Sequence, residues 1–405
     1  MLDDFGQRIR DIILYEMDLS RELSDEEICD LIGSVVSREA RDRPMTIKDR
    51  AELERTIFNS LRKLDVLQEL VDDRDVTEIM VNGPNDIFYE KAGRIQRFKG
   101  HFSSEEKLED VIQQIVGRHN RVVNQASPIV DTRLSDGSRV NIVLNPISIG
   151  GSAVSIRKFP EHPMSMERLV EIEALSPEVA RLLQILTQAK YNIFISGGTG
   201  SGKTTFLNAL SQYIPDDERI ITIEDSAELQ LLGAKNIVRL ETRNANTDGV
   251  TPITIRDLIR TALRMRPDRI IVGECRGAEA LDMLQAMNTG HDGSLSTGHA
   301  NSPHDIISRI ETMVLQGQDF PLNAIRQQIA SGIDIIVQLG RLRDKSRRVL
   351  EISEVDGFMD GEIVLHTLYR FEETAVLDSG RIQGFLKKAG TLCHTDKLMA
   401  AGLSV

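Results

Sequence analysis

The feature that most constrains the fold is a glycine-rich run between an apolar segment and an amphipathic one. Residues 197–204 read Gly-Gly-Thr-Gly-Ser-Gly-Lys-Thr and match the G-x-x-x-x-G-K-[ST] pattern of a P-loop. The largely apolar residues 192–196 predict a strand before this run, and Lys203–Tyr213 predicts a helix after it. A P-loop needs that order, because its backbone N–H groups and the start of the helix together surround phosphate oxygens. We therefore expect an α/β nucleotide-binding domain.

Each position of the loop has an expected task. Lys203 is expected to place its ammonium group on the phosphates of ATP, and the Thr204 hydroxyl is expected to ligate Mg²⁺. The predicted ATP-binding residues are Gly198, Thr199, Gly200, Ser201, Gly202, Lys203, Thr204 and Thr205, the last of them beside an α-phosphate oxygen. The alternatives are a plain glycine-rich turn and a dinucleotide-binding turn, and the second would leave Lys203 without a role.

Composition narrows the class of protein. The chain has 405 residues, enough for two or three domains, and its 62 acidic against 49 basic residues give a net charge of −13. This charge disfavours a dedicated nucleic-acid-binding protein, because such affinity comes from cations that neutralise phosphates. The three cysteines are far apart, which disfavours disulfides and cysteine metal sites. No apolar run approaches the length of a membrane helix and the start does not resemble a signal peptide, so we expect a cytoplasmic protein.

Three segments differ in pattern. Residues 1–70 predict a helical module, in which Ser24 with Glu27 and Thr46 with Asp49 have the spacing of capping boxes. Residues 71–160 predict an α+β domain, with short strands around a helix at 104–117, a hairpin turn at 135–137 and a linker marked by Pro160. Residues 161–405 alternate strands with helices, including one over 255–266, and predict a doubly wound α/β sheet. After residue 333 we expect short strands at 334–339, 348–355 and 362–369.

Two strand ends carry candidate catalytic carboxylates. The apolar residues 270–272 are followed by Gly273-Glu274, at the Walker B position where P-loop enzymes usually place Asp. We expect Glu274 to orient or deprotonate the attacking water and to act as a second Mg²⁺ ligand. Glu224 ends another strand and is expected to help position Mg²⁺ and water, with Asp225 as a helix cap in the competing interpretation. Ligands of open α/β sheets bind at this edge of the sheet.

Histidines and arginines complete the candidate site. His299 and His291 stand at the two ends of one predicted strand and are expected to sense the γ-phosphate; their spacing disfavours a metal site. An arginine cluster (Arg243, Arg256, Arg260, Arg264, Arg266 and Arg269) suggests arginine fingers, although several of its members must pair with surplus carboxylates. Arg157, at the expected domain junction, is the better-placed finger. The basic run 341–348 is expected to be a solvated hairpin turn rather than a membrane or partner contact.

Taken together, these motifs resemble the secretion ATPase superfamily of type II and type IV secretion and type IV pili. The P-loop, the Asp box 223–225, the Gly273-Glu274 Walker B motif and the His box from Gly290-His291 to Gly298-His299 occur in the family's order. Residues 130–141, 155–159 and 262–274 resemble most closely the CpaF/TadA branch that drives Tad/Flp pilus assembly. The resemblance covers about residues 75–370.

The resemblance implies a RecA-like ATPase domain in a homohexameric ring, with ATP in a cleft that Arg157 reaches from the N-terminal side. It implies polytopic inner-membrane platform proteins as partners and a peripheral location at the inner membrane. The expected function is a Mg-ATP-hydrolysing motor for Tad/Flp pilus assembly or secretion. The alternatives are an ATPase for protein or conjugative export, and an assembly scaffold that ATP gates with incidental turnover.

Overall fold

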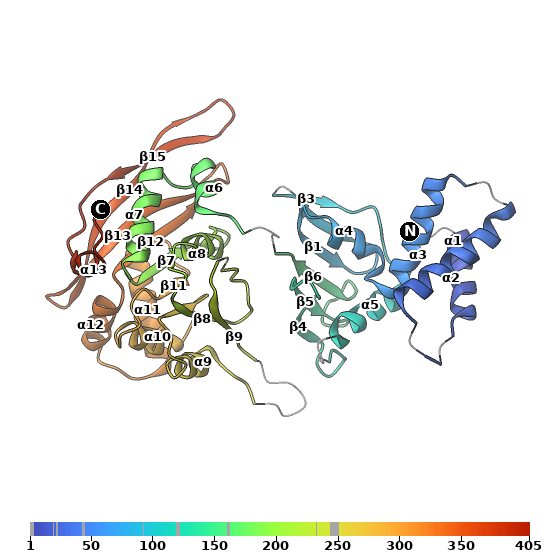
Figure 1. The fold of residues 1–405 in the computed structure, drawn as a ribbon, viewed down its shortest axis with the longest axis horizontal. Helices are drawn as coiled ribbons and strands as arrows, with labels where there is room; N and C mark the ends of the chain where they lie inside the picture. The colour runs from blue at the N-terminus through green and yellow to red at the C-terminus, as the bar shows by residue number, and fades with distance from the viewer. Residues whose placement is uncertain are drawn as a thin grey trace. The chain divides into compact units, whose positions relative to one another are not determined.

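The computed structural model describes residues 4–18, 20–21, 23–42, 45–91, 93–118, 122–159, 163–231, 233–243 and 251–405. The chain forms two compact units, Met1–Glu161 and His162–Val405 (Figure 1). The linker expected at Pro160 lies outside the described residues.

The first unit begins with the expected helices α1 (Asp4–Glu16), α2 (Asp25–Glu39) and α3 (Ile47–Arg62). Both predicted capping boxes are confirmed. The side chains of Ser24 and Thr46 accept from the backbone N–H three residues on, and the carboxylates of Glu27 and Asp49 accept from the backbone N–H of Ser24 and Thr46. The helices bury one another's apolar stripes in a small core of Ile9, Ile13, Ile28, Ile32, Val35, Val36 and Ile57.

A six-stranded antiparallel sheet follows in the same unit, in the order β3-β2-β1-β6-β5-β4. Its elements are α4 (Gln68–Asp72), β1 (Val76–Asn82), β2 (Ile87–Lys91), β3 (Arg94–Arg97), α5 (Glu105–Gly117), β4 (Ile129–Arg133), β5 (Arg139–Val143) and β6 (Ala153–Arg157). Helix α5, capped by Ser104, packs its apolar stripe on the sheet. The expected hairpin joins β4 to β5, and Gly137 takes the positive φ of its turn.

The second unit alternates helices and strands. Its elements are α6 (Met166–Glu171), α7 (Pro177–Gln188), β7 (Ile193–Gly197), α8 (Lys203–Ser211), β8 (Arg219–Glu224), β9 (Asn236–Glu241), α9 (Ile255–Ala262), β10 (Arg269–Val272), α10 (Glu279–Met287), β11 (Leu295–Gly298), α11 (Pro303–Gly317), α12 (Leu322–Gly332), β12 (Ile335–Arg341), β13 (Arg347–Met359), β14 (Glu362–Val376), β15 (Ile382–Lys388) and α13 (Asp396–Ala401).

Its nine strands form one mixed sheet in the order β15-β14-β13-β12-β7-β11-β10-β8-β9. The strands from β12 to β9 pair in parallel, whereas β13, β14 and β15 extend the sheet as antiparallel neighbours. Helices α7 and α8 share a core with one face, and α9 to α12 share a core with the other (Figure 1). Strand β7 contributes to both, with Ile193 and Ile195 in the first core and Phe194 in the second. The expected α/β fold class is confirmed.

Several boundaries differ from expectation. Helix α9 ends at Ala262 rather than at residue 266, because Pro267 disfavours helical geometry at Arg266, whose φ is +54°. The expected strand at 334–339 is confirmed as β12, whereas the strands expected at 348–355 and 362–369 are too short, since β13 has 13 residues and β14 has 15. Strand β15 and helices α6, α12 and α13 were not predicted.

Candidate nucleotide site

Four segments far apart in the sequence meet at one edge of the nine-stranded sheet. The P-loop follows β7, His299 follows β11, Glu274 comes just after β10, and Glu224 ends β8. These strands are parallel and adjacent in the order β7-β11-β10-β8, so their carboxyl ends lie side by side. The topology therefore brings together the phosphate loop, one histidine and two carboxylates.

The P-loop glycines are required by close approaches and by backbone conformation. A Cβ atom at Gly197 would lie 2.5 Å from Ser201 Oγ and 2.7 Å from the Leu339 carbonyl oxygen. Gly200 and Gly202 have φ angles of +71° and +95°, and Gly202 immediately precedes α8. The Ser201 hydroxyl is buried and has no hydrogen-bond partner within the described part of the chain.

Lys203 is a buried cation at the start of α8. Its side chain bends back so that Nζ donates to the carbonyl oxygens of Gly197, at 3.0 Å, and Gly198, at 3.2 Å. Only 8% of the residue is exposed, and this burial lowers the pKa of Lys203. Among the residues that the structure describes, no carboxylate lies within 4.0 Å of its ammonium group. A buried cation held by carbonyl oxygens and a neighbouring ring nitrogen, rather than by a carboxylate, fits an anionic ligand such as a phosphate.

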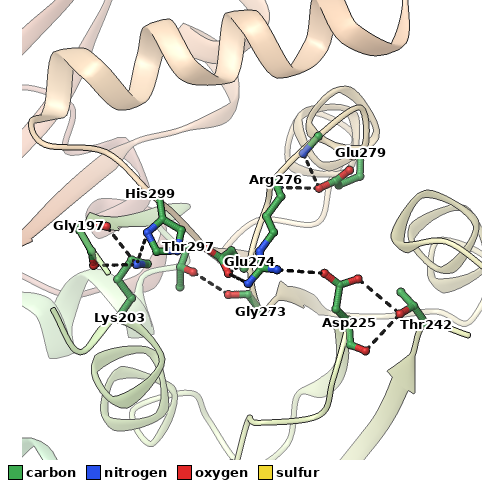
Figure 2. A network of polar contacts seen from close by, with 12 residues as sticks. Gly197, Lys203, Asp225, Thr242, Gly273, Glu274, Arg276, Glu279, Thr297 and His299 are labelled. Atoms are coloured by element: carbon green, nitrogen blue, oxygen red, sulfur yellow. Dashed lines mark hydrogen bonds and ion pairs between the residues drawn. The ribbon is translucent and has the colours of Figure 1, made fainter. Parts of the chain in front are cut away.

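His299 connects Lys203 to Glu274 (Figure 2). Lys203 Nζ lies 3.2 Å from His299 Nδ1, and His299 Nε2 lies 2.6 Å from Glu274 Oε1. Because the ammonium group can only donate, Nδ1 must accept and Nε2 must carry the proton that faces the carboxylate. Burial lowers the pKa of His299 and outweighs the opposing effect of Glu274, which agrees with a neutral ring.

Arg276 holds the second oxygen of Glu274 and was not predicted. Its Nε atom donates to Glu274 Oε2 at 2.8 Å, and its guanidinium lies 4.0 Å from Asp225 Oδ2 (Figure 2). Its own backbone N–H donates to Glu279 Oε1 at 2.7 Å, which anchors this loop to the start of α10. The one signal in the sequence that could have indicated this contact is that Arg276 follows Glu274 by two residues.

Gly273 allows β8 and β10 to approach closely beside Glu224. A Cβ atom at Gly273 would lie 2.8 Å from Glu224 Cγ. Glu224 is 4% exposed, and its Oε1 accepts from the backbone N–H groups of Glu228, at 2.8 Å, and Leu229, at 3.0 Å. One oxygen of Glu224 thus organises the following loop, and its action on Mg²⁺ and water stays a prediction.

His291 and Arg157 lie elsewhere. His291 precedes β11, at the opposite end of that strand from His299, and its Nδ1 lies 3.3 Å from the Ala286 carbonyl oxygen. That position does not support a phosphate-sensing role for His291. Arg157 ends β6 in the first unit, where its exposed side chain lies 3.8 Å from Glu78 Oε1. Its role as an arginine finger stays a prediction.

Three members of the arginine cluster pair with carboxylates. Arg256 and Arg260 both bond to Asp282, at 2.7 and 2.8 Å, and Arg269 is fully buried against Glu218. The pairing expected for several members is therefore present.

The expected hairpin turn joins β12 to β13. From it, Arg347 Nε donates to the P-loop carbonyl of Gly200 at 2.9 Å. This contact was not predicted.

The oxygen donors at this edge fit Mg²⁺. Thr204 opens α8 beside Lys203, and Glu274 supplies carboxylate oxygens. Within the described ranges, no group of three or more His, Cys, Asp or Glu side chains could hold a metal ion. Mg²⁺ is commonly bound through one or two protein oxygens together with substrate phosphates, and this donor set suits that mode.

Comparisons with known proteins agree on one family. Residues 60–383 match the family model described as type II/IV secretion system protein. A Mycobacterium tuberculosis protein named for conjugal transfer is 33% identical over 322 residues, covering 77% of this chain and 91% of its own. The type IV secretion system protein PtlH of Bordetella pertussis is 33% identical over 320 residues, covering 73% and 94%.

The fold also matches a solved structure of the pilus retraction motor PilT with bound ADP. The TM-score is 0.55 at 22% identity, and the match covers 82% of this chain and 84% of that chain.

Proposed function

The chain belongs to the type II/IV secretion system protein family, and on that premise we propose that it is a Mg-ATP-hydrolysing motor of such a system. The observation that carries the proposal is the contact series Lys203–His299–Glu274 at the carboxyl edge of the parallel strands. It joins the phosphate-binding cation to the acid that would act on water. A nucleotide-binding protein without turnover would not need Glu274 connected through His299 to that cation.

Each group has a proposed part. The P-loop amides and Lys203 bind the β- and γ-phosphates. The Thr204 hydroxyl and Glu274 would hold Mg²⁺, which would supply positive charge at the γ-phosphate. Glu274 accepts the proton of the attacking water, or orients it. Glu224 supports the same water from the neighbouring strand, and His299 contacts the γ-phosphate. Arg157 is proposed to supply an additional positive charge in the transition state.

We also propose that the protein works as a homohexamer on polytopic platform proteins at the inner membrane, as a cytoplasmic, peripheral ATPase. No helix in the described part of the chain combines the length and apolar character that a bilayer crossing needs. Two cargo systems remain candidates. The motif likeness to Tad/Flp pilus motors favours fibre assembly, whereas relatives named for conjugal transfer and type IV secretion favour export.

The direct test is ATP hydrolysis by the purified full-length chain and by Lys203→Ala, with assembly measured by size-exclusion chromatography and light scattering. We expect the wild type to hydrolyse Mg-ATP as a hexamer. Lys203→Ala should lose ATP binding, because the phosphates keep backbone donors but lose the cation of the loop. Wild-type nucleotide affinity in Lys203→Ala would contradict the site assignment.

A further inference from the structure

The P-loop is contacted by a cation that lies outside its motif. Strand β12 pairs in parallel with β7, with Leu339 opposite Gly197, so the turn after β12 leaves the sheet at the same edge as the P-loop. Strand β13 then begins at Arg347. The antiparallel extension of the sheet therefore delivers Arg347 to the phosphate loop.

Arg347 lies across the part of the loop that precedes α8. Its Nε donates to the Gly200 carbonyl at 2.9 Å, and a Cβ atom at Gly202 would be 3.5 Å from its Cδ. Both glycines have positive φ, and the amides of this segment are those that surround phosphates in a P-loop. The guanidinium is therefore placed against the loop that is expected to surround the anion.

The turn that presents Arg347 is fixed by its own hydrogen bonds. Asp344 Oδ1 accepts from the backbone N–H of Ser346 at 2.9 Å, and its Oδ2 accepts from that of Ile382 at 2.8 Å. Burial alone would raise the pKa of Asp344, but these N–H groups and the Ser346 hydroxyl lower it to about 2. The carboxylate is thus charged and holds the turn at neutral pH.

Arg347 differs from Arg343 and Arg348 in having no charged partner among the described residues. Arg343 pairs with Glu373, and buried Arg348 pairs with Glu173. Within the ranges that the structure describes, no carboxylate lies within 4.0 Å of the Arg347 guanidinium, and its one hydrogen bond goes to a neutral carbonyl. The chain has a net charge of −13, so carboxylates are in excess, yet this exposed arginine has none beside it. Arg347 is therefore available to an anionic ligand at the P-loop.

We propose that Arg347 is a second phosphate-binding cation of this site, in addition to Lys203. When a nucleotide binds, the guanidinium exchanges the Gly200 carbonyl for an oxygen of the polyphosphate. The guanidinium then pairs with a charged oxygen instead of a neutral carbonyl and can form two parallel hydrogen bonds with the phosphate, so the exchange favours the bound state. The inference rests on the proposed nucleotide-binding function and assigns part of that affinity to the β12–β13 hairpin.

The test is a titration of the full-length protein with a fluorescent ADP analogue, followed by competition with ATP, ADP and adenosine at fixed salt. Arg347→Ala and Arg347→Gln should each weaken Mg-ATP and Mg-ADP binding by about tenfold, the scale of a charged hydrogen bond. The affinity for adenosine, which has no phosphate, should be the same in the variants as in the wild type. The matched control is Lys345→Ala, which removes an exposed cation two residues away and should stay within about twofold of wild type.

Three results would overturn the proposal. Wild-type affinity in both Arg347 variants would show that Arg347 does not contact the phosphates. Tighter binding in the variants would show that Arg347 blocks the loop. An equal loss for adenosine and ADP would assign Arg347 to loop structure rather than to phosphate. These results differ from a failure of the proposed function, in which the wild type would not bind Mg-ATP or Lys203→Ala would bind it normally.

Discussion

At the scale of single residues, the central feature is that the groups expected to act on ATP are engaged with one another. Lys203 donates to loop carbonyls and to His299, and Glu274 faces His299 and Arg276. A bound polyphosphate would compete for Lys203, and a bound water would compete for Glu274. His299 contacts both Lys203 and Glu274, so we expect its protonation state to affect the stability of the folded protein.

The first prediction concerns the pH dependence of stability in His299→Gln. Because the folded protein lowers the pKa of His299, the unfolded chain binds more protons below the ordinary value of about 6.5. The contribution of neutral His299 is therefore complete above that pH and is lost as the pH falls toward the folded pKa. Gln can accept from Lys203 and donate to Glu274 without titrating.

Thermal unfolding of the nucleotide-free protein from pH 7.5 to 5.5 measures this effect. We expect the wild type to lose melting temperature more steeply on acidification than His299→Gln does. Parallel curves, or a wild type that gains on the variant as the pH falls, would show that burial does not hold the ring neutral.

The motif residues of the site could be predicted from the sequence, whereas their partners could not. Lys203, Thr204 and Glu274 stand at fixed positions relative to a strand end, which local pattern reveals. Arg276 and Arg347 reach the site because of the order of strands in the sheet, and that order cannot be read from a single sequence. The same lack of tertiary information gave His291 a role that its end of β11 does not support.

At the scale of elements, the approach of β8 to β10 depends on Gly273. A methyl group there would lie 2.8 Å from Glu224 Cγ, and Glu224 is fixed by two backbone amides. We predict that Gly273→Ala destabilises the second unit by about 1–3 kcal/mol, as overpacking of a close contact does. It should also slow hydrolysis by displacing Glu224. Urea unfolding measures the first effect, and a change of less than about 0.5 kcal/mol would mean that the strands adjust freely.

The matched control is Gly33→Ala in α2, where an added Cβ meets nothing within 4 Å. This substitution should stabilise the first unit by about 0.5–1 kcal/mol, because alanine favours the helix interior. A loss of stability in Gly33→Ala would show that the space around a glycine does not by itself decide the effect of substituting it.

Helices with caps and apolar stripes were the most predictable elements. Ser24 and Thr46 each cap the helix that the sequence suggested. The β14–β15 hairpin was only partly predictable, because its outer half is mostly exposed. Strand pairing rather than burial maintains that half, and pairing leaves little trace in a single sequence.

At the scale of the whole molecule, the second unit contains the complete P-loop, both carboxylates and His299, and it has its own two cores. A fragment of residues 163–405 keeps Ser165, the cap of α6, and the buried Met166. We predict that this fragment folds cooperatively and binds Mg-ATP but hydrolyses it slowly, since it lacks Arg157. Circular dichroism, nucleotide titration and phosphate release measure the three properties.

Arg157→Ala in the full chain separates a missing charge from a missing domain. Its side chain is exposed, so the substitution should leave folding and assembly unchanged. We expect hydrolysis at saturating Mg-ATP to fall by about a hundredfold or more, as for loss of an arginine finger. Full activity in a correctly assembled Arg157→Ala ring would make Arg157 a structural residue of β6.

The central claim is that Glu274 converts a nucleotide-binding edge into a hydrolytic one, and Glu274→Gln tests it most directly. Gln keeps the size of the side chain but has neither negative charge nor basicity. Equilibrium binding and single-turnover hydrolysis of Mg-ATP should be measured on the same preparation. We predict near wild-type binding with hydrolysis lower by about a hundredfold or more, the scale of losing a general base. Undiminished hydrolysis would contradict the account and transfer the role to Glu224.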